Sequence, residues 1–172
     1  MRSVTQRSLQ ARSENQEYST KVTKMTSGSS KQLEVEQRNL GVIKAWAEAW
    51  RLPGGSAARM VDEIYADEPD VVAVLQGHRV SGEGNFKQAW RKAELQIEGV
   101  YAERKIVFGT VIASGNSVAF EGEVRMTTKE GESRGWPFSA FMVFNEEGRI
   151  VSDHTYMPDS PHGQLFEDAA RC

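Results

Sequence analysis

Cysteine is almost absent from this 172-residue sequence. The single cysteine, Cys172, is the last residue and has no partner for an intrachain disulfide. A fold stapled by disulfide bonds is therefore excluded, and we expect a reducing, cytoplasmic environment.

Long apolar runs and metal-binding motifs are missing too. No stretch approaches the roughly eighteen apolar residues that a membrane-spanning helix needs, so we expect no membrane span. The three histidines, His78, His154 and His162, have neither His-x-His nor His-Glu-x-x-His spacing, which argues against a metal site. The glycines of Gly82–Gly84 lack the lysine of a phosphate-binding loop. We therefore expect no metal and no cofactor.

Positive charge is concentrated at one end of the chain. Residues 1–32 carry six Lys or Arg against two Glu, whereas the remainder carries fifteen basic residues against twenty-two acidic ones. Because binding to phosphates needs clustered positive charge, an acidic body without a basic stripe argues against nucleic acid as a partner.

The basic end is predicted to be a disordered tail over residues 1–34, since its polar composition cannot bury enough surface to offset the entropy of ordering. Residues 161–172 form a second short tail, and residues 35–160 the single domain. The first thirteen residues contain three Arg and no acid, as a mitochondrial presequence would, but Val4 and Leu9 form only a weak apolar face. Mitochondrial targeting and a start at Met25 instead of Met1 both stay open.

Three segments have helical spacing of apolar residues, and one short segment reads as a strand. The helices are predicted over Gln37–Arg51, from Ser56 to about Ala66, and around Trp90. Val71–Leu75 is β-branched and predicts a strand, and Gly77–Gly84 predicts a loop.

After Leu95 the pattern becomes that of an antiparallel meander, because short glycine-bearing turns separate four apolar or alternating runs. In the second run, Ser117–Thr128, the even-numbered residues are largely apolar and the odd-numbered ones largely polar, which predicts one buried face. Glu121, Glu123 and Arg125 then form an exposed or dimer-facing row. The third run is apolar at nearly every position from Phe138 to Phe144, which indicates a strand covered on both faces. The other two strands are predicted over Tyr101–Ala113 and Arg149–Met157.

Helices followed by such a meander predict an α+β domain, in which three N-terminal helices pack against a strongly bent antiparallel sheet. The element order, together with the motif Phe-x-x-Glu-Gly-Arg-Ile-Val at Phe144–Val151, resembles the nuclear transport factor 2 (NTF2)-like superfamily. Within it, the chain looks most like SnoaL-like polyketide cyclases and their isomerase and epoxide hydrolase relatives. The resemblance covers Leu40–Met157. It implies a cone that encloses one largely apolar pocket, and a homodimer formed through the outer sheet face.

The resemblance does not carry over the catalytic residues of these relatives. Where the isomerases have a Tyr and a protonated Asp, this chain has Trp46 and Ala140, and no carboxylate occurs near Val74–Gln76, where their base would lie. The epoxide hydrolases use an Asp-Arg-Asp relay. At the matching positions this chain has Gly122, Val124 and Thr155 instead.

Two neighbouring residues, Asp153 and His154, remain as candidates for acid-base catalysis. The comparison with the family places Asp153 and Thr155 on the face that points into the cone, where burial would raise the pKa of the carboxyl group. If the register slips by one residue, His154 points inward instead and becomes the acid-base group.

The remaining candidates would contact a ligand. Several aromatic side chains could line a pocket for an apolar or aromatic molecule, although most residues at helical spacing must be core. Gln76 and His78 lie in the loop predicted to overhang the pocket mouth, where a polar loop tip explains them equally well. The full set of predicted ligand-binding residues is Trp46, Tyr65, Gln76, His78, Trp90, Phe120, Val124, Ala140, Met142 and Thr155.

Two functions stay open. The first is a cofactor-independent cyclase, isomerase or lyase that acts on a small apolar carbonyl compound through Asp153. The alternative is a non-catalytic module of the same fold that binds a hydrophobic ligand or dimerises. The sequence does not identify a substrate.

Overall fold

The computed structural model describes residues 29–52, 54, 56–67, 72–75, 78–81 and 86–157. The predicted tail over residues 1–34 lies outside this part up to residue 28, and the predicted C-terminal tail lies outside it entirely. No helix in the described part is long and apolar enough to cross a membrane.

Three helices precede the long strands in the described part of the chain. They are α2 (Ser30–Arg51), α3 (Ser56–Ile64) and α4 (Phe86–Val100). Helix α2 begins earlier than the apolar spacing predicted, because the Ser29 side chain caps it and accepts a hydrogen bond from the backbone N–H of Gln32 at 3.3 Å. Residues 30–34, which the sequence analysis assigned to the tail, are therefore helical.

Six strands form one sheet in the order β2-β1-β6-β5-β4-β3. Their bounds are β1 (Val72–Leu75), β2 (His78–Ser81), β3 (Tyr101–Ser114), β4 (Ser117–Thr128), β5 (Ser133–Phe144) and β6 (Ile150–Tyr156). All neighbours pair antiparallel except β1 and β6, which pair parallel.

Strand β2 corrects the prediction of a loop over Gly77–Gly84. Strand β2 pairs antiparallel with β1, and Leu75 is the register partner of His78. The glycines that indicated a loop flank this short strand in the sequence, and composition alone does not reveal its pairing with β1.

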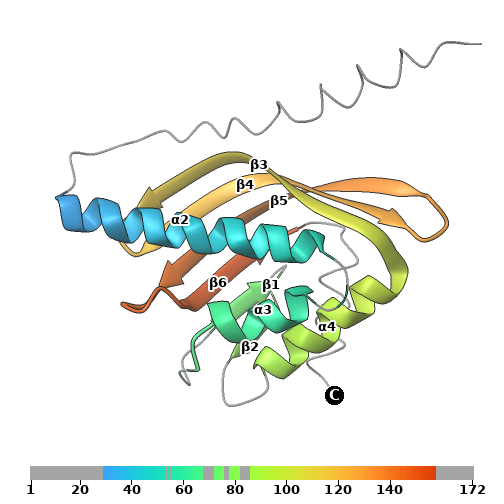
Figure 1. The fold of residues 1–172 in the computed structure, drawn as a ribbon, viewed down its shortest axis with the longest axis horizontal. Coiled ribbons are helices and arrows are strands. Elements are labelled where there is room, and N and C mark those ends of the chain that lie inside the picture. Colours follow the sequence, from blue (N-terminus) through green and yellow to red (C-terminus); the bar gives the residue numbers. More distant parts are fainter. Residues whose placement is uncertain are drawn as a thin grey trace, which may run out of the picture.

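The long strands β3, β4 and β5 bend, and α2 runs across their inner face, whereas α3 and α4 lie toward the end that holds β1 and β2 (Figure 1). The strand alternation fits this arrangement, since the even-numbered residues Val118, Phe120, Val124 and Met126 of β4 are buried. The predicted α+β architecture with three helices against a bent sheet is confirmed.

The outer sheet face is open in the single chain. Phe141 of β5 is 47% exposed, so the expectation of a strand covered on both sides holds only for the inner face. Glu121 and Arg125 of β4 are also exposed, as predicted for this face.

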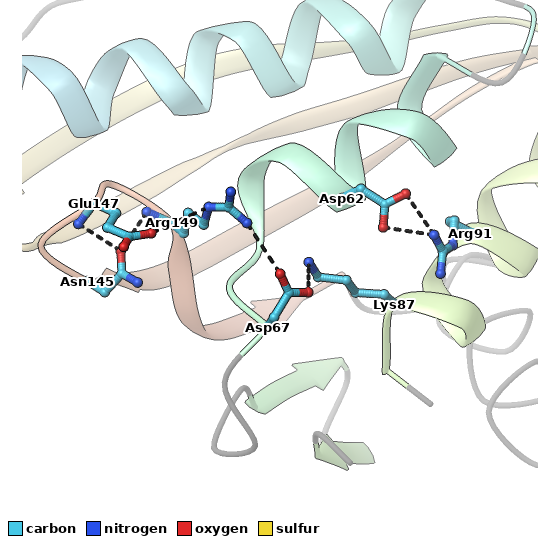
Figure 2. Close-up of polar contacts among 7 residues, drawn as sticks. All are labelled: Asp62, Asp67, Lys87, Arg91, Asn145, Glu147 and Arg149. Atoms are coloured by element: carbon cyan, nitrogen blue, oxygen red, sulfur yellow. Dashed lines mark hydrogen bonds and ion pairs between the residues drawn. The ribbon is translucent and has the colours of Figure 1, made fainter. Parts of the chain in front are cut away.

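Exposed ion pairs join α3 to its neighbours (Figure 2). Arg91 of α4 contacts Asp62 of α3 at 2.7 Å, and Lys87 contacts Asp67, just after α3, at 2.6 Å. Arg149, before β6, approaches the same Asp67 at 3.5 Å. These contacts hold the C-terminal end of α3 beside both α4 and β6.

Candidate functional site

Asp153 lies on the inner face of the sheet and is fully buried. It is paired in register with Met142 of β5 on one side and with Ala73 of β1 on the other. His154 lies on the opposite face and is half-buried, together with Phe141, Ile112 and Tyr156 around a shallow cavity of about 430 Å³. Of the two acid-base candidates, Asp153 is therefore the one on the buried inner face of the sheet.

Two hydroxyl groups converge on the Asp153 carboxyl. The Tyr65 hydroxyl donates to Oδ2 at 2.5 Å, and the Thr155 hydroxyl donates to Oδ1 at 2.6 Å. Thr155 reaches this position because it lies two residues along the same strand and therefore on the same face. We call these three residues the Asp153 cluster.

The backbone at the end of α3 places Tyr65. Its N–H donates to the Val61 carbonyl at 3.2 Å, which continues the helical hydrogen bonding, and the next residue, Ala66, donates to the Ile150 carbonyl at 3.0 Å. Tyr65 thus forms a parallel bridge with Ile150 at the start of β6. Its ring lies 5.5 Å from that of Trp90, measured between ring centroids.

Burial dominates the electrostatics of the cluster. It raises the pKa of Asp153, although the hydrogen bonds from Thr155 and Tyr65 and the nearby His154 oppose the shift. Burial, reinforced by the Asp153 charge, raises the pKa of Tyr65 well above its usual value. The tyrosine therefore stays a neutral donor, and the carboxyl is closer to its neutral form than an exposed aspartate is.

A second buried polar cluster was not predicted from the sequence. Glu94 of α4 is 1% exposed and accepts hydrogen bonds from Trp50 Nε1 at 3.2 Å and from Arg104 at 3.1 Å. Arg104 also donates to Glu98 at 2.8 Å and lies 5.1 Å from the centre of the Trp50 ring. Burial raises the pKa of Glu94 to about 7, against the opposing charge of Arg104.

The sequence did carry a signal for this cluster. Glu94 falls four residues after Trp90 and three before Ile97, so it interrupts the apolar face of α4. Arg104 likewise points inward on β3, two residues before the buried Ile106.

Most of the predicted ligand-binding residues come together in the interior. Phe120, Ala140 and Thr155 are register neighbours on three adjacent strands. The buried members of the set are Trp46, Tyr65, Trp90, Phe120, Val124, Ala140, Met142 and Thr155. Gln76 lies outside the described residues, and His78 is the first residue of β2. Within the described part of the chain, no group of three His, Cys, Asp or Glu could hold a metal ion.

Chemically, the Asp153 cluster combines a buried carboxyl group with a neutral phenol hydroxyl. Such a pair can exchange a proton with a polar group brought into hydrogen-bond reach, because a carboxyl with a raised pKa binds and releases protons closer to neutrality.

Comparison with known proteins gives a fold but no close relative. No family model matches the chain, and no curated protein is significantly similar. Solved structures do match. An epoxide hydrolase described as LEH-like from M. tuberculosis has a TM-score of 0.57 at 14% identity, over 78% of this chain and 92% of that one.

Two further structures match over a similar extent. An NTF2-like protein of unknown function from Exiguobacterium sp. 255-15 has a TM-score of 0.55 at 14% identity, covering 69% of this chain and 99% of that one. A protein of the SnoaL-like family from Agrobacterium tumefaciens has a TM-score of 0.52 at 17% identity, covering 70% and 97%. At such identities the likeness is one of architecture, and the chain has the NTF2-like fold.

Proposed function

We propose that the protein binds a small, largely apolar carbonyl compound inside the cone and shifts a proton on it through Asp153. The observation that carries this proposal is the 2.5 Å hydrogen bond from the Tyr65 hydroxyl to the fully buried Asp153 carboxyl. Similar structures include an epoxide hydrolase and a protein of the SnoaL-like family, which is compatible with a small-molecule substrate.

The reaction needs no co-reactant. The ionised Asp153 takes a proton from the carbon next to the carbonyl group, and negative charge moves to the carbonyl oxygen. Once protonated, Asp153 no longer needs the Tyr65 proton, so the phenol can donate to that oxygen instead. Return of the proton to a second carbon gives an isomer, and attack of the carbanion on another carbonyl of the same molecule gives a ring.

Hydrogen–deuterium exchange tests the proposal without knowledge of the natural substrate. A panel of aromatic and terpenoid ketones is incubated with the protein in D₂O, and loss of the proton next to the carbonyl is followed by NMR. We expect at least one ketone to exchange faster than in buffer. Asp153→Asn should slow that exchange by roughly a hundredfold or more, within the range of general acid-base catalysis.

His154→Gln is the matched control, since His154 is the adjacent residue on the opposite face. It should leave the exchange rate unchanged. If His154→Gln abolishes exchange while Asp153→Asn does not, the acid-base group is the imidazole. If thermal shifts report ketone binding but no ketone exchanges, the protein is a ligand-binding module.

A second candidate function is a non-catalytic module that assembles as a homodimer through the outer sheet face. Its support is the group of large apolar side chains exposed on that face: Ile112 at 44%, and Phe141 and Tyr156 at 47% each. Register places Ile112, Ala119 and Phe141 in one row across β3, β4 and β5. A contiguous apolar row of this kind is typical of a protein interface.

Sedimentation at tens of micromolar tests the dimer. We expect a mass of twice the 19.2 kDa of one chain. Phe141→Glu should give a monomer, whereas Lys129→Glu, in the exposed turn after β4, should not. A wild-type mass near that of one chain would reject this interface.

A further inference from the structure

Two adjoining cavities lie at the edge of the sheet formed by β3. The first is a groove of about 410 Å³ between α2 and β3, and the second is a broader hollow of about 740 Å³ over the far ends of β3, β4 and β5. Arg51 and Lys105 line both of them. Neither cavity includes a residue of the Asp153 cluster.

The groove has an apolar floor that belongs to the core. Its floor residues are Leu40 and Ile43 of α2 and Ile106, Phe108 and Val111 of β3. Ala47 of α2 also lines the groove, and its single methyl group leaves room beside the larger side chains. A volume of this size lies within the range of small-molecule sites, about 300 to 1,000 Å³.

The shape of the edge strand helps to keep the groove open. The pairing of β3 with β4 shifts register between Phe108 and Val111, which marks a bulge. A bulge bends and twists its strand locally. The two residues at this register shift, Phe108 and Val111, both line the floor of the groove.

The groove has a basic rim in a protein whose overall charge is negative. The groove is lined by three basic side chains, Lys44, Arg51 and Lys105, and by one acidic side chain, Glu48. Glu48 contacts Arg51 at 2.5 Å. The adjoining hollow adds Arg125 and Arg134. Its acids are Glu103 and Glu123, and Glu123 pairs with Arg125 at 2.8 Å. Basic residues therefore meet the apolar groove at its junction with the hollow.

We infer that the groove binds an amphipathic anion, with its apolar chain or ring on the α2–β3 floor and its acidic head group beside Lys105 and Arg51. The apolar floor would contact the tail of the ligand. The two basic residues that line both cavities, Arg51 and Lys105, would contact its head group. This site does not depend on the function proposed for Asp153, because β6 lies three strands from β3, or about 14 Å at the usual strand spacing.

Decanoate, used below its micelle concentration, is a suitable probe, and decyltrimethylammonium is a control with the same tail and the opposite charge. Isothermal titration calorimetry on the full chain should give saturable binding of decanoate at least tenfold tighter than that of the cation. Lys105→Glu should weaken decanoate binding by tenfold or more. Lys129→Glu makes the same charge change on an exposed turn and should alter it less than twofold.

Ala47→Phe fills the groove and should abolish decanoate binding, with thermal melting as the check that the variant folds. Asp153→Asn should leave decanoate binding unchanged. The proposal is overturned if decanoate and the cation bind equally, if Lys105→Glu and Lys129→Glu behave alike, or if Asp153→Asn removes the binding. It is also overturned if decanoate does not bind. A change in the sedimentation mass with Ala47→Phe would then assign the groove to a second copy of the chain.

Discussion

Tyr65 and Asp153 depend on each other inside the cone, because neither side chain reaches water in the folded chain. Each of the two carboxyl oxygens accepts one hydrogen bond, Oδ2 from the Tyr65 hydroxyl and Oδ1 from the Thr155 hydroxyl. When a buried acceptor loses its hydrogen-bond donor, the free-energy cost of removing that acceptor from water is no longer offset. The cluster therefore stabilises the fold in addition to any role in binding or catalysis.

Tyr65→Phe should lower the free energy of unfolding by about 1 to 3 kcal/mol, since it removes only the hydroxyl group that donates a hydrogen bond to Asp153 Oδ2. Urea unfolding at neutral pH measures the change. Tyr156→Phe is the matched control, because Tyr156 is 47% exposed on the outer face, and it should cost less than about 0.5 kcal/mol. Equal effects of the two variants would show that the Tyr65 hydroxyl contributes nothing specific.

Glu94 should make stability depend on pH. Its pKa is about 7 in the fold and 4.5 ordinarily, so between these values the folded state holds a proton that the unfolded state has lost. The free energy of unfolding should therefore fall as pH rises from about 4.5 to 7. Since the folded-state pKa of about 7 lies about 2.5 above the ordinary 4.5, the Glu94 contribution is on the order of 1 to 3 kcal/mol.

Urea unfolding at about pH 5 and pH 7.5 measures this loss of stability. Glu94→Gln cannot titrate and should lose less stability over that interval, even if it is less stable throughout because Arg104 has a weaker partner. Glu130→Gln, in the exposed turn after β4, should keep the wild-type difference. If Glu94→Gln also keeps it, Glu94 is already ionised in the fold at pH 5.

Among the secondary-structure elements, β3 and β4 approach each other closely at Gly122. Gly122 of β4 pairs with Phe108 at the start of the β3 bulge. A Cβ atom added there would lie 2.2 Å from the Val107 carbonyl oxygen and 3.1 Å from the Phe138 ring. The glycine is needed for this close approach of one backbone to another.

Gly122→Ala should lower the free energy of unfolding by about 2 kcal/mol or more, because the Val107 backbone cannot move without disturbing the bulge. Gly99→Ala is the control, since a Cβ there meets nothing within 4 Å and alanine favours α4 by about 0.5 to 1 kcal/mol. Thermal melting should therefore shift down for the first variant and slightly up for the second. A Gly122→Ala protein as stable as wild type would mean that the two strands separate readily.

At the scale of the whole molecule, helix α2 is anchored to the turn between β5 and β6. Arg38 donates to the backbone carbonyl of Glu146 and, at 3.2 Å, to that of Asn145, both at the turn between β5 and β6. The N-terminal half of α2 is thus tied to the end of the sheet.

Deletion of residues 1–28 should leave the melting temperature within about 2 °C of the full chain, because that segment is too polar to bury much surface. The shortened chain keeps Ser29, which caps α2. Differential scanning calorimetry of both chains gives the comparison. A fall of several degrees would show instead that the basic segment packs on the domain.

Local sequence patterns were enough to predict the three helices against the long antiparallel strands, but not strand β2 or its place in the sheet. Period-two alternation over Ser117–Thr128 identified the buried face of β4, and the glycine-bearing turns marked the meander. The same alternation, with the family resemblance, placed Asp153 inside and His154 outside. Helical spacing also identified α3 and α4, but it placed the start of α2 too late because the cap at Ser29 precedes any apolar repeat.

By itself, then, the sequence determined most of the helices and strands and the buried face of β4, because those properties depend on neighbours a few positions away. Only the tertiary structure decided that Tyr65 donates to Asp153, 88 residues further along the chain, and that Glu94 pairs with Arg104 across α4 and β3. It also decided the pairing of β2 and the meeting of an apolar groove with basic residues at the β3 edge. These features join residues from different elements, and their distances are set by how the helices seat on the bent sheet, which no local pattern encodes.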